Sequence, residues 1–381
     1  MKFNYPITIG ILGGGQLAKM LAQVAYRMGM KVAIIENHPN SPAGDLTKLD
    51  FSKGWKEKDE LDKFIDVCDV VTLENEFIDI RILEYIERKK PVFPSSKTMK
   101  LVQDKFIQKN TFLNAGVPVP EFQVINSIDE IRQFASKFGF PFVLKSRFMG
   151  YDGYGNATIR TESEIEPIYS KFMQQPNRNL LYAERFVNFQ KELAIMIARN
   201  QTSEIAIYPL VETIQRNHIC NEVLAPADVP DEIVDKARKI AKKCVESIDG
   251  IGIFGIEFFY ENGEIMVNEI APRPHNTGHY TIEACYTSQF ENAIRAILDL
   301  PLGNPKMIVP AAVMINLLGE RNGNGSPTDI SGVLKVPNTF LHLYNKKESR
   351  IGRKMGHITV LGNDLNETYS RALNAKNHFK W

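Results

Sequence analysis

Short apolar runs alternate with amphipathic segments through the first hundred residues. Residues 7–12, 31–36 and 67–73 have the pattern of buried strands. Residues 16–28 follow the first of them with apolar side chains at helical spacing, namely Leu17, Met20, Leu21, Val24 and Met28. Strands that alternate with helices favour a parallel sheet covered on both faces. This part of the chain is therefore predicted to be a small doubly wound α/β domain.

A second group of elements follows a proline-rich boundary. Residues 99–113 are predicted to form one helix, and Pro118 and Pro120 then end the pattern because proline lacks an amide donor and restricts the residue before it. The strand predicted at 141–146 leads into the glycine-rich segment 147–155. A strand that ends in such a loop is a candidate for ligand binding.

Two later segments have clear helical signals. Ser127 and Glu130 have the spacing of a capping box, which predicts that a helix begins there. Residues 231–248 form an amphipathic pattern, and Cys244 lies on its apolar stripe. Cys244 is therefore interpreted as a core residue and not as a reactive thiol.

The composition is that of a folded globular protein. The 381 residues include 46 basic and 45 acidic side chains and are 44% hydrophobic, which suggests two or three domains. The net charge of +1 argues against a globally basic nucleic-acid-binding protein. The four cysteines form no C-x-x-C pair, which favours a reducing cytoplasm. No signal-peptide pattern or long apolar run is present, so we expect no export and no membrane span.

Residues 13–18 match the pattern G-x-G-x-x-G/A between a predicted strand and a predicted helix. Glycines there let a phosphate approach backbone amides at a helix N-terminus. Glu36 ends the next strand, at the position where a dinucleotide-binding fold places its ribose-binding acid. Alone, this pattern suggests an NAD-dependent dehydrogenase. The alternatives are a phosphate site for another ligand and a plain tight turn.

Two glutamates flank the strongest hairpin signal in the chain, Asn262-Gly263. Glu257 and Glu269 each lie inside an apolar run, where an unpaired charge is costly. With Asn268 they offer oxygen ligands suited to Mg²⁺ bound to a nucleoside triphosphate. A two-residue turn would place the glutamates on opposite faces, whereas a three-residue loop would place them on one face. We predict the second register, or a bulge with the same effect, if both bind metal; otherwise they are solvated carboxylates.

Cations and polar side chains complete the candidate chemistry. Lys145 lies inside an apolar strand beside the glycine loop, and a buried lysine needs an anion. Lys105 could equally be an ordinary surface lysine. The loop 271–281 crowds arginine, asparagine and histidines together, as expected for an anionic or heterocyclic substrate, although its histidines could be ordinary loop residues. The basic run 346–357 contains glycines that permit a phosphate-binding loop, but such runs are usually a solvated face.

Taken in order, four motifs resemble the ATP-grasp superfamily and, more closely, the carboxyaminoimidazole ribonucleotide synthetase family of purine biosynthesis. The motifs are GGGQLA at 13–18, GYDGYG at 150–155, NEIAPRPHNTGHYT at 268–281 and RKMGH at 353–357. The resemblance implies an ATP-grasp fold of mixed α/β and α+β class in three parts. These are a Rossmann-like pre-ATP-grasp domain over 1–108, a lid over 109–188 and a C-terminal ATP-grasp region over 189–381.

The resemblance also implies site residues. It assigns catalytic roles to Asp152 for the amine proton, Arg273 for carboxyphosphate and Lys145 for phosphate charge. It assigns ATP contacts to Lys105, Lys145, Gly150, Tyr151, Asp152, Gly153, Tyr154, Gly155, Glu184, Arg185, Phe186, Val187, Glu192, Gln215, Asn268 and Glu269. It assigns substrate contacts to Gly15, Gln16, Leu17, Tyr151, Asp152, Arg273, His275, Asn276, Arg353 and either Lys346 or Lys347. Glu257, Glu269 and Asn268 match the magnesium ligands.

The implied reaction is ATP-dependent carboxylation of 5-aminoimidazole ribonucleotide with bicarbonate, through carboxyphosphate, by a cytoplasmic homodimer that uses Mg²⁺. Met149, Tyr154 and Gln215 depart from the family pattern, which has a glycine, a basic residue and a histidine at these places. Two rival hypotheses remain: another ATP-grasp ligase, such as the formate-dependent glycinamide ribonucleotide transformylase, and the NAD-dependent dehydrogenase.

Overall fold

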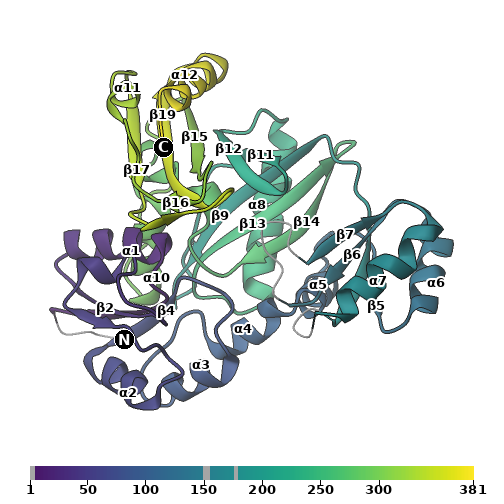
Figure 1. The fold of residues 1–381 in the computed structure, drawn as a ribbon, viewed down its shortest axis with the longest axis horizontal. Helices are drawn as coiled ribbons and strands as arrows, with labels where there is room; N and C mark the ends of the chain where they lie inside the picture. The colour runs from purple at the N-terminus through teal and green to yellow at the C-terminus, as the bar shows by residue number, and fades with distance from the viewer. Residues whose placement is uncertain (1–4, 149–154, 176–178) are drawn as a thin grey trace.

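Three large sheets and one two-stranded sheet organise the described part of the protein (Figure 1). The structure is a computed structural model and describes residues 5–148, 155–175 and 179–381. A four-stranded sheet lies near the N-terminus, a second four-stranded sheet lies in a separate lobe, and a nine-stranded sheet lies between and above them. No helix in the described part of the chain is long and apolar enough to cross a membrane.

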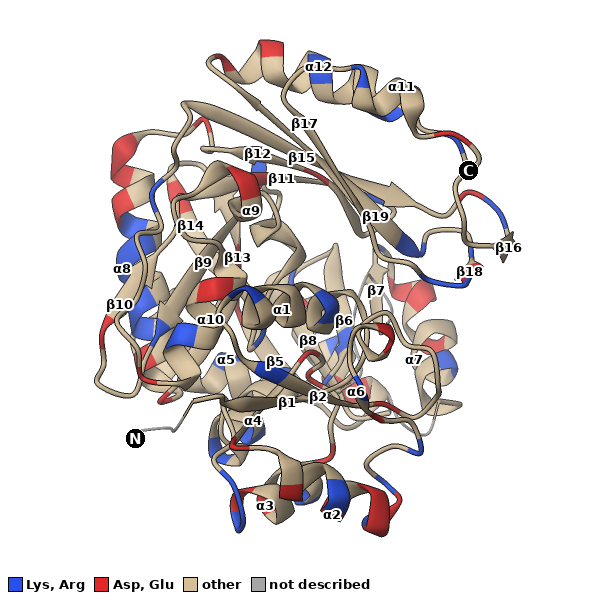
Figure 2. Cartoon of the chain, turned by 90° about the vertical axis from the view of Figure 1, so that its left-hand side faces the viewer, with Lys and Arg blue, Asp and Glu red and all other residues tan. Residues whose placement is uncertain are grey.

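The N-terminal sheet is parallel, with strand order β3-β2-β1-β4. Its strands are β1 (Thr8–Leu12), β2 (Lys31–Ile35), β3 (Leu49–Phe51) and β4 (Val70–Leu73). Its helices are α1 (Gln16–Arg27), α2 (Lys58–Val67) and α3 (Ile80–Glu87). Separate apolar clusters pack α1 on one face and α2 with α3 on the other, so the predicted doubly wound arrangement is correct. Figure 2 shows that basic and acidic side chains are interspersed on the outer helices, in keeping with the near-zero net charge.

The segment predicted as one helix over 99–113 is instead two helices, α4 (Ser96–Gln103) and α5 (Lys105–Asn114). Asp104 separates them because its carboxylate accepts hydrogen bonds from the amides of Phe106 and Ile107 at 3.0 and 3.2 Å. An aspartate that caps a helix in this way competes with continuation of the preceding helix. The resulting bend carries α5 away from the N-terminal domain and onto the large sheet.

The lid is an antiparallel sheet of order β5-β8-β6-β7 with two helices (Figure 1, right). Its elements are β5 (Phe122–Ile125), α6 (Ile128–Phe138), β6 (Phe142–Ser146), β7 (Asn156–Ile159), α7 (Ile165–Met173) and β8 (Leu181–Arg185). Its apolar residues form a cluster of their own. The predicted cap of α6 is present, since Ser127 Oγ accepts from the Glu130 amide at 3.3 Å.

The large sheet is antiparallel throughout, in the order β14-β13-β9-β11-β12-β15-β19-β17, with β10 also paired to β9. Its strands are β9 (Lys191–Arg199), β10 (Ile205–Ile207), β11 (Val211–Arg216), β12 (Ile219–Ala225), β13 (Gly252–Glu261), β14 (Glu264–Ala271), β15 (Ala311–Leu318), β17 (Thr339–Leu343) and β19 (Lys354–Gly362). The helices packed on it are α8 (Asp231–Ser247), α10 (Gln289–Ile297) and α12 (Leu365–Asn377).

Short elements complete the chain. They are α9 (Thr281–Ala284), α11 (Ser331–Leu334), and the strand pair β16 (Gly323–Asn324) and β18 (Glu348–Ser349). Cys244 lies fully buried on α8, as predicted, and burial raises the pKa of its thiol. All four cysteines are buried, and none of them forms a disulfide.

The hairpin of β13 and β14 settles the predicted register. Asn262 and Gly263 form a two-residue turn, with φ of 50° and 83°, and Glu261 pairs with Glu264. The three-residue loop is therefore wrong. The pairing then shifts by one residue, so that Glu257 stands opposite Glu269 with Asn268 as the extra residue. The predicted bulge is confirmed.

Candidate active site

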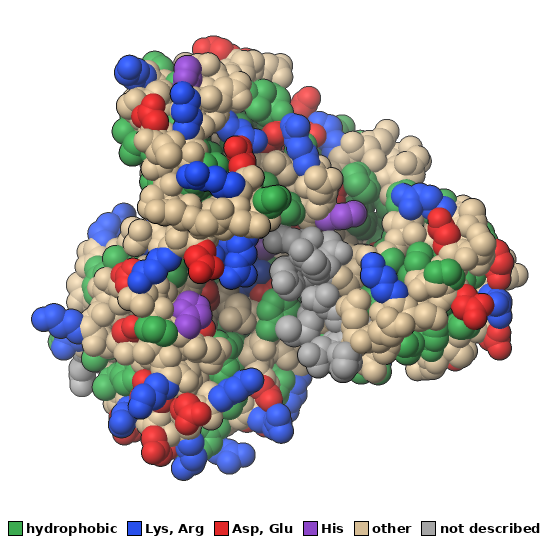
Figure 3. Space-filling view, viewed as in Figure 1, with side chains coloured by type: hydrophobic (Ala, Val, Ile, Leu, Met, Phe, Trp, Pro, Cys, Tyr) green, Lys and Arg blue, Asp and Glu red, His purple; other side chains and the backbone are tan. Residues whose placement is uncertain are grey.

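A cavity of about 980 Å³ lies where the N-terminal domain, the lid and the large sheet meet. Figure 3 shows basic and histidine side chains near the junction of the three parts. Of the predicted site residues, the cavity is lined by Gln16, Leu17, Lys105, Lys145, Glu184, Arg185, Phe186, Val187, Glu192, Gln215, Glu257, Asn268, Glu269, Arg273, His275 and Asn276. Residues 150–154 of the predicted site lie outside the described residues, whereas Gly155 follows β6 and accepts a hydrogen bond from the Ser146 amide at 2.7 Å.

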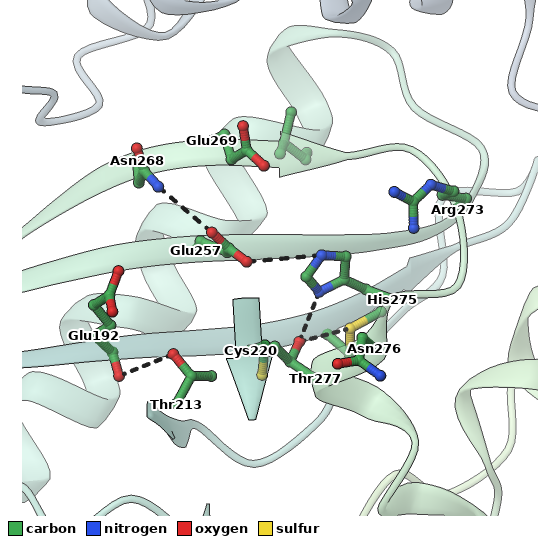
Figure 4. Close-up of polar contacts among 12 residues, drawn as sticks. Glu192, Thr213, Cys220, Glu257, Asn268, Glu269, Arg273, His275, Asn276 and Thr277 are labelled. Atoms are coloured by element: carbon green, nitrogen blue, oxygen red, sulfur yellow. Dashed lines mark hydrogen bonds and ion pairs between the residues drawn. The ribbon is translucent and has the colours of Figure 1, made fainter. Parts of the chain in front are cut away.

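The paired glutamates Glu257 and Glu269 line this cavity from neighbouring strands (Figure 4). Burial, then the charges of Glu269 and Glu192, raises the pKa of Glu257 to about 8. Asn268 Nδ2 donates to Glu257 Oε2 at 3.4 Å, and Lys105 Nζ lies 3.1 Å from Glu269 Oε2. Two carboxylates that face each other in a cavity call for a cation, and oxygen ligands suit Mg²⁺. The donor set therefore fits the predicted metal.

This donor set is incomplete without a nucleotide. Among the described residues, no group of three or more histidine, cysteine, aspartate or glutamate side chains stands close enough together to hold a metal ion. Magnesium in phosphate-transfer sites is commonly held by one or two carboxylates, with phosphate oxygens and waters supplying the other ligands. The pair Glu257 and Glu269 has the character of such a shared site.

Glu184 lies between two lysines. Its Oε1 accepts from Lys145 Nζ at 2.6 Å, and its Oε2 lies 2.6 Å from Lys109 Nζ, a charge contact without hydrogen-bond alignment. Burial would raise the pKa of Glu184, but the two ammonium groups outweigh it and hold that pKa below its ordinary value. The Glu184 side chain, predicted among the ATP contacts, is thus engaged by cations. Sequence reasoning missed Lys109, although it lies four residues after Lys105 on one helix.

Arg273 is held by a second residue that sequence reasoning missed, Glu76. Arg273 Nη2 donates to Glu76 Oε1 at 3.0 Å, and Arg273 Nε makes a further short contact with Glu76 Oε2. Although burial opposes it, the positive charge of Arg273 lowers the pKa of Glu76 to about 2. Gln103 Nε2 anchors the same segment by donating to the Glu76 carbonyl at 2.8 Å. The guanidinium is therefore fixed in the cavity with a permanent counter-ion.

The polar loop after β14 is ordered by its own hydrogen bonds. His275 Nδ1 lies 2.9 Å from Thr277 Oγ1, and His275 Nε2 lies 3.7 Å from Glu257 Oε1. Burial, then the charge of Arg273, lowers the pKa of His275 to about 3, so the ring is neutral and its contact with Glu257 is no ion pair. Asn276 and Asn316 exchange side-chain hydrogen bonds at 3.0 and 2.6 Å. The loop thus presents neutral donors and acceptors.

The glycine turn at the start of α1 holds carboxylates of the protein itself. Gly14 N donates to Glu36 at 3.0 Å, Gly15 N donates to Glu74 at 2.6 Å, and Ala18 N donates to Glu74 at 3.0 Å. A Cβ atom at Gly15 would lie 2.5 Å from Glu74 Oε1. The glycine lets the carboxylate approach, and the amides that would bind a pyrophosphate are taken. This arrangement argues against the dehydrogenase hypothesis, while Gln16 and Leu17 still face the cavity.

One end of the cavity has an apolar wall. Phe189 and Phe259 stack with ring centroids 5.2 Å apart and planes 11° apart, and both line the cavity. Glu192 lies nearby on β9, and burial raises its pKa to about 7. Gln215 also lines this region, at a bulge between β11 and β12. Paired aromatic rings beside a carboxylate suit a planar base linked to a sugar.

The basic loop lies beside the main cavity. Lys346 and Lys347 line a second cleft of about 780 Å³. Lys346 Nζ donates to the Lys354 carbonyl at 2.8 Å, and Arg353 Nη1 donates to the Glu348 carbonyl at 2.6 Å. In this structure Lys354, which was not predicted, lines the main cavity, whereas Lys346 and Arg353 do not.

Three family models match the chain. They describe a ribonucleotide synthetase preATP-grasp domain over residues 7–103, an ATP-grasp domain over 110–290 and a phosphoribosylaminoimidazole carboxylase C-terminal domain over 312–371. The N5-carboxyaminoimidazole ribonucleotide synthase of Synechococcus elongatus is 38% identical over 92% of this chain and 89% of its own length. The phosphoribosylaminoimidazole carboxylase of Saccharomyces cerevisiae is 39% identical over 96% of the chain, which spans only 65% of that relative.

Solved structures agree with these matches, and the ATP-grasp fold predicted from the motifs is confirmed. The N5-carboxyaminoimidazole ribonucleotide synthetase from Thermotoga maritima is 40% identical, with a TM-score of 0.88 over 98% of this chain and 99% of that one. The N5-carboxyaminoimidazole synthase from Aspergillus clavatus, in complex with ADP and 5-aminoimidazole ribonucleotide, is 34% identical, with a TM-score of 0.88 over 97% of this chain and 98% of that one.

Proposed function

The chain belongs to the N5-carboxyaminoimidazole ribonucleotide synthetase family of ATP-grasp ligases, and we propose that it carboxylates 5-aminoimidazole ribonucleotide with bicarbonate at the expense of ATP. One observation carries the proposal. A single cavity brings the facing carboxylates Glu257 and Glu269 together with Lys145 and the anchored Arg273. A metal-dependent triphosphate site thus shares its space with an arginine suited to an anionic intermediate.

The nucleotide would lie between the lid and the large sheet. Lys105 and Lys145 would offset the negative charge of its phosphates, and Glu192 would accept hydrogen bonds from the ribose hydroxyls. The backbone that follows Glu184, through Arg185, Phe186 and Val187, would face the adenine edge. Glu257, Glu269 and Asn268 would hold Mg²⁺, which when bound stabilises charge on the phosphate oxygens.

The chemistry requires positioning and no covalent nucleophile. A bicarbonate oxygen attacks the γ-phosphorus, the bond to the bridging oxygen breaks, and ADP leaves, which produces carboxyphosphate. The exocyclic amine of the substrate then attacks the carboxyl carbon, and phosphate departs. Arg273, fixed by Glu76, would stabilise the carboxyphosphate, and Asp152 would accept the amine proton. Asp152 rests on the family motif alone, because it lies outside the described residues.

The substrate would enter from the N-terminal domain. Gln16, Leu17, His275 and Asn276 would contact its sugar and imidazole. Its 5-phosphate would reach the basic loop, where Lys346 and Arg353 carry the positive charge. A homodimer in the cytoplasm remains part of the proposal, supported by the family resemblance and, for the reducing compartment, by four buried cysteines that form no disulfide.

An ADP-release assay on the purified protein tests the proposal. ATP turnover should rise well above background only when 5-aminoimidazole ribonucleotide and bicarbonate are both present. Glycinamide ribonucleotide with formate is the matched comparison, because a transformylase of the same superfamily would respond to that pair instead. Equal turnover with and without 5-aminoimidazole ribonucleotide would refute the assignment.

A further inference from the structure

Lys109 is a buried lysine that the reaction outlined above does not use. Its side chain is 2% exposed, yet it carries an ammonium group in a wall of the main cavity. That group lies 2.6 Å from Glu184 Oε2 and 3.5 Å from the carbonyl oxygen of Val267. Burial, opposed by the charge of Glu184, lowers its pKa. A lysine is almost never fully buried unless its charge is paired, and Glu184 is the partner of Lys109 here.

The balance of charges around Glu184 links Lys109 to the active site. One carboxylate lies between two ammonium groups, since Lys145 Nζ is also 2.6 Å away, on the other oxygen. The trio therefore has one positive charge in excess, and Lys145 is the more exposed cation, at 12%. Without Lys109, the carboxylate and Lys145 would form a neutral pair. The cavity would then lose the positive charge that phosphate oxygens require.

The position of Lys109 is fixed by the helix that carries it. Gln108 Nε2 donates to the Ile270 carbonyl at 3.3 Å, and Gln108 Oε1 accepts from the Ile270 amide at 3.1 Å. These bonds tie α5 to β14, the edge strand of the large sheet. Glu184 belongs to β8 in the lid sheet. The contact of Lys109 with Glu184 consequently joins the lid to the large sheet beside the nucleotide site.

We infer that Lys109 is a positioning residue, which holds the Glu184 carboxylate so that the charge of Lys145 remains available to the phosphates of ATP. The inference rests on the proposed function for the identity of the nucleotide. This positioning role differs from a merely structural one, because the weaker nucleotide binding caused by removing Lys109 should disappear when the charge of Glu184 is also removed. If the ion pair were merely structural, removing one or both of its members would change the stability of the protein but leave its affinity for the nucleotide the same.

A double-mutant cycle tests this inference, with ADP and Mg²⁺ titrated into each protein by calorimetry. Lys109→Met should weaken ADP binding about tenfold, the loss expected for one charge-assisted contact. Lys109→Met combined with Glu184→Gln should restore the affinity to within about threefold of the parent. Glu184→Gln alone should bind ADP at least as tightly as the parent, because the Glu184 side chain contacts the two lysines and only the backbone that follows it would face the adenine. Lys239→Met, on the exposed face of α8, is the matched control and should leave the affinity unchanged.

Several outcomes would overturn the inference. An unchanged affinity of Lys109→Met for ADP would show that Lys109 does not act through Glu184. An equal loss of ADP affinity in Lys109→Met and in the double variant would show the same. If Lys109→Met fails to fold, weakened binding in Glu184→Gln would still contradict the role given to Lys145. In steady-state turnover, Lys109→Met should show a raised KM for ATP and an unchanged KM for 5-aminoimidazole ribonucleotide. If the parent protein binds no ADP, the proposed function itself is wrong, so the two failures can be distinguished.

Discussion

Glu257 stands directly opposite Glu269 because Asn268 adds one residue to β14 and shifts its pairing with β13. In a regular ladder, Glu257 would face Asn268, and Glu269 would point to the other side of the sheet. The bulge thus places both carboxylates on one face, where the charge of Glu269 adds to burial in raising the pKa of Glu257. The repulsion between the two carboxylates reduces the stability of the fold, and it leaves a site that a cation can complete.

Replacing Glu269 by glutamine should separate the catalytic role of this pair from its cost to stability. We expect Mg²⁺-dependent turnover to fall by at least about a hundredfold, because one of two charged ligands is lost. Without metal or nucleotide, the melting temperature should rise, since the lost repulsion with Glu257 outweighs the lost ion pair of Lys105 with the partly exposed Glu269 carboxylate. Steady-state ADP release and calorimetric melting check both effects. Glu264→Gln, on the exposed turn of the same hairpin, is the control, and near-normal turnover in Glu269→Gln would sink the metal assignment.

The Glu76–Arg273 pair predicts a specific acid dependence of stability. Folding lowers the pKa of Glu76 from the ordinary 4.5 to about 2. The carboxylate therefore stabilises the fold fully above about pH 5, and this contribution, about 3 kcal/mol, is lost as the pH falls through 2. In denaturant unfolding followed between pH 7 and 2, the stability difference between the parent and Glu76→Gln should shrink toward low pH. A difference independent of pH would show that the pair adds no such linkage.

Glu192 should behave in the opposite sense. Burial raises its pKa to about 7, above the ordinary 4.5, so the folded protein holds a proton that the unfolded chain releases. The group favours folding below pH 4.5, and that benefit is lost as the pH rises through 7. Glu192→Gln should therefore gain stability over the parent at pH 8 and show no gain at pH 4, measured by urea titration.

The same variant tests the nucleotide contact of Glu192. KM for ATP should rise about tenfold, because a carboxylate that accepts from ribose hydroxyls is replaced by a neutral amide. Glu320→Gln, on an exposed loop, should change neither stability nor KM. An unaltered KM for ATP in Glu192→Gln would remove this residue from the nucleotide site.

The glycine turn predicts a steric cost that depends on one neighbour. Gly15 has φ of −75°, which any residue adopts, yet a Cβ there would lie 2.5 Å from Glu74 Oε1. Gly15→Ala should destabilise the protein by about 1–3 kcal/mol through this clash. In a Glu74→Ala background the same change should cost much less, and denaturant unfolding of the four proteins measures the coupling. An equal cost in both backgrounds would show that Glu74 is not the obstacle.

Local patterns along the chain predicted much of the architecture. The strand–helix alternation before residue 100 became the doubly wound domain, and the stripe over 231–248 became α8, because short-range periodicity dictates which face is buried. The order of four short motifs indicated the family, since glycines, lysines and paired acids occur in that sequence for one kind of chemistry. The pattern over 99–113 wrongly predicted one helix. A single side chain divides it, because Asp104 ends α4 and caps α5.

Only the tertiary structure determined which residues far apart in the sequence contact each other. Glu76 and Arg273 are 197 residues apart, and Gly15 and Glu74 are 59 apart, so no local pattern could pair them. The role of Lys109 depends on α5 docking against β14 while the lid brings Glu184 to it. The residue types that carry charge were determined by the sequence alone. Which charges face each other depended on the packing of the three parts and on one bulge, because electrostatic interactions follow distance in space and not along the chain.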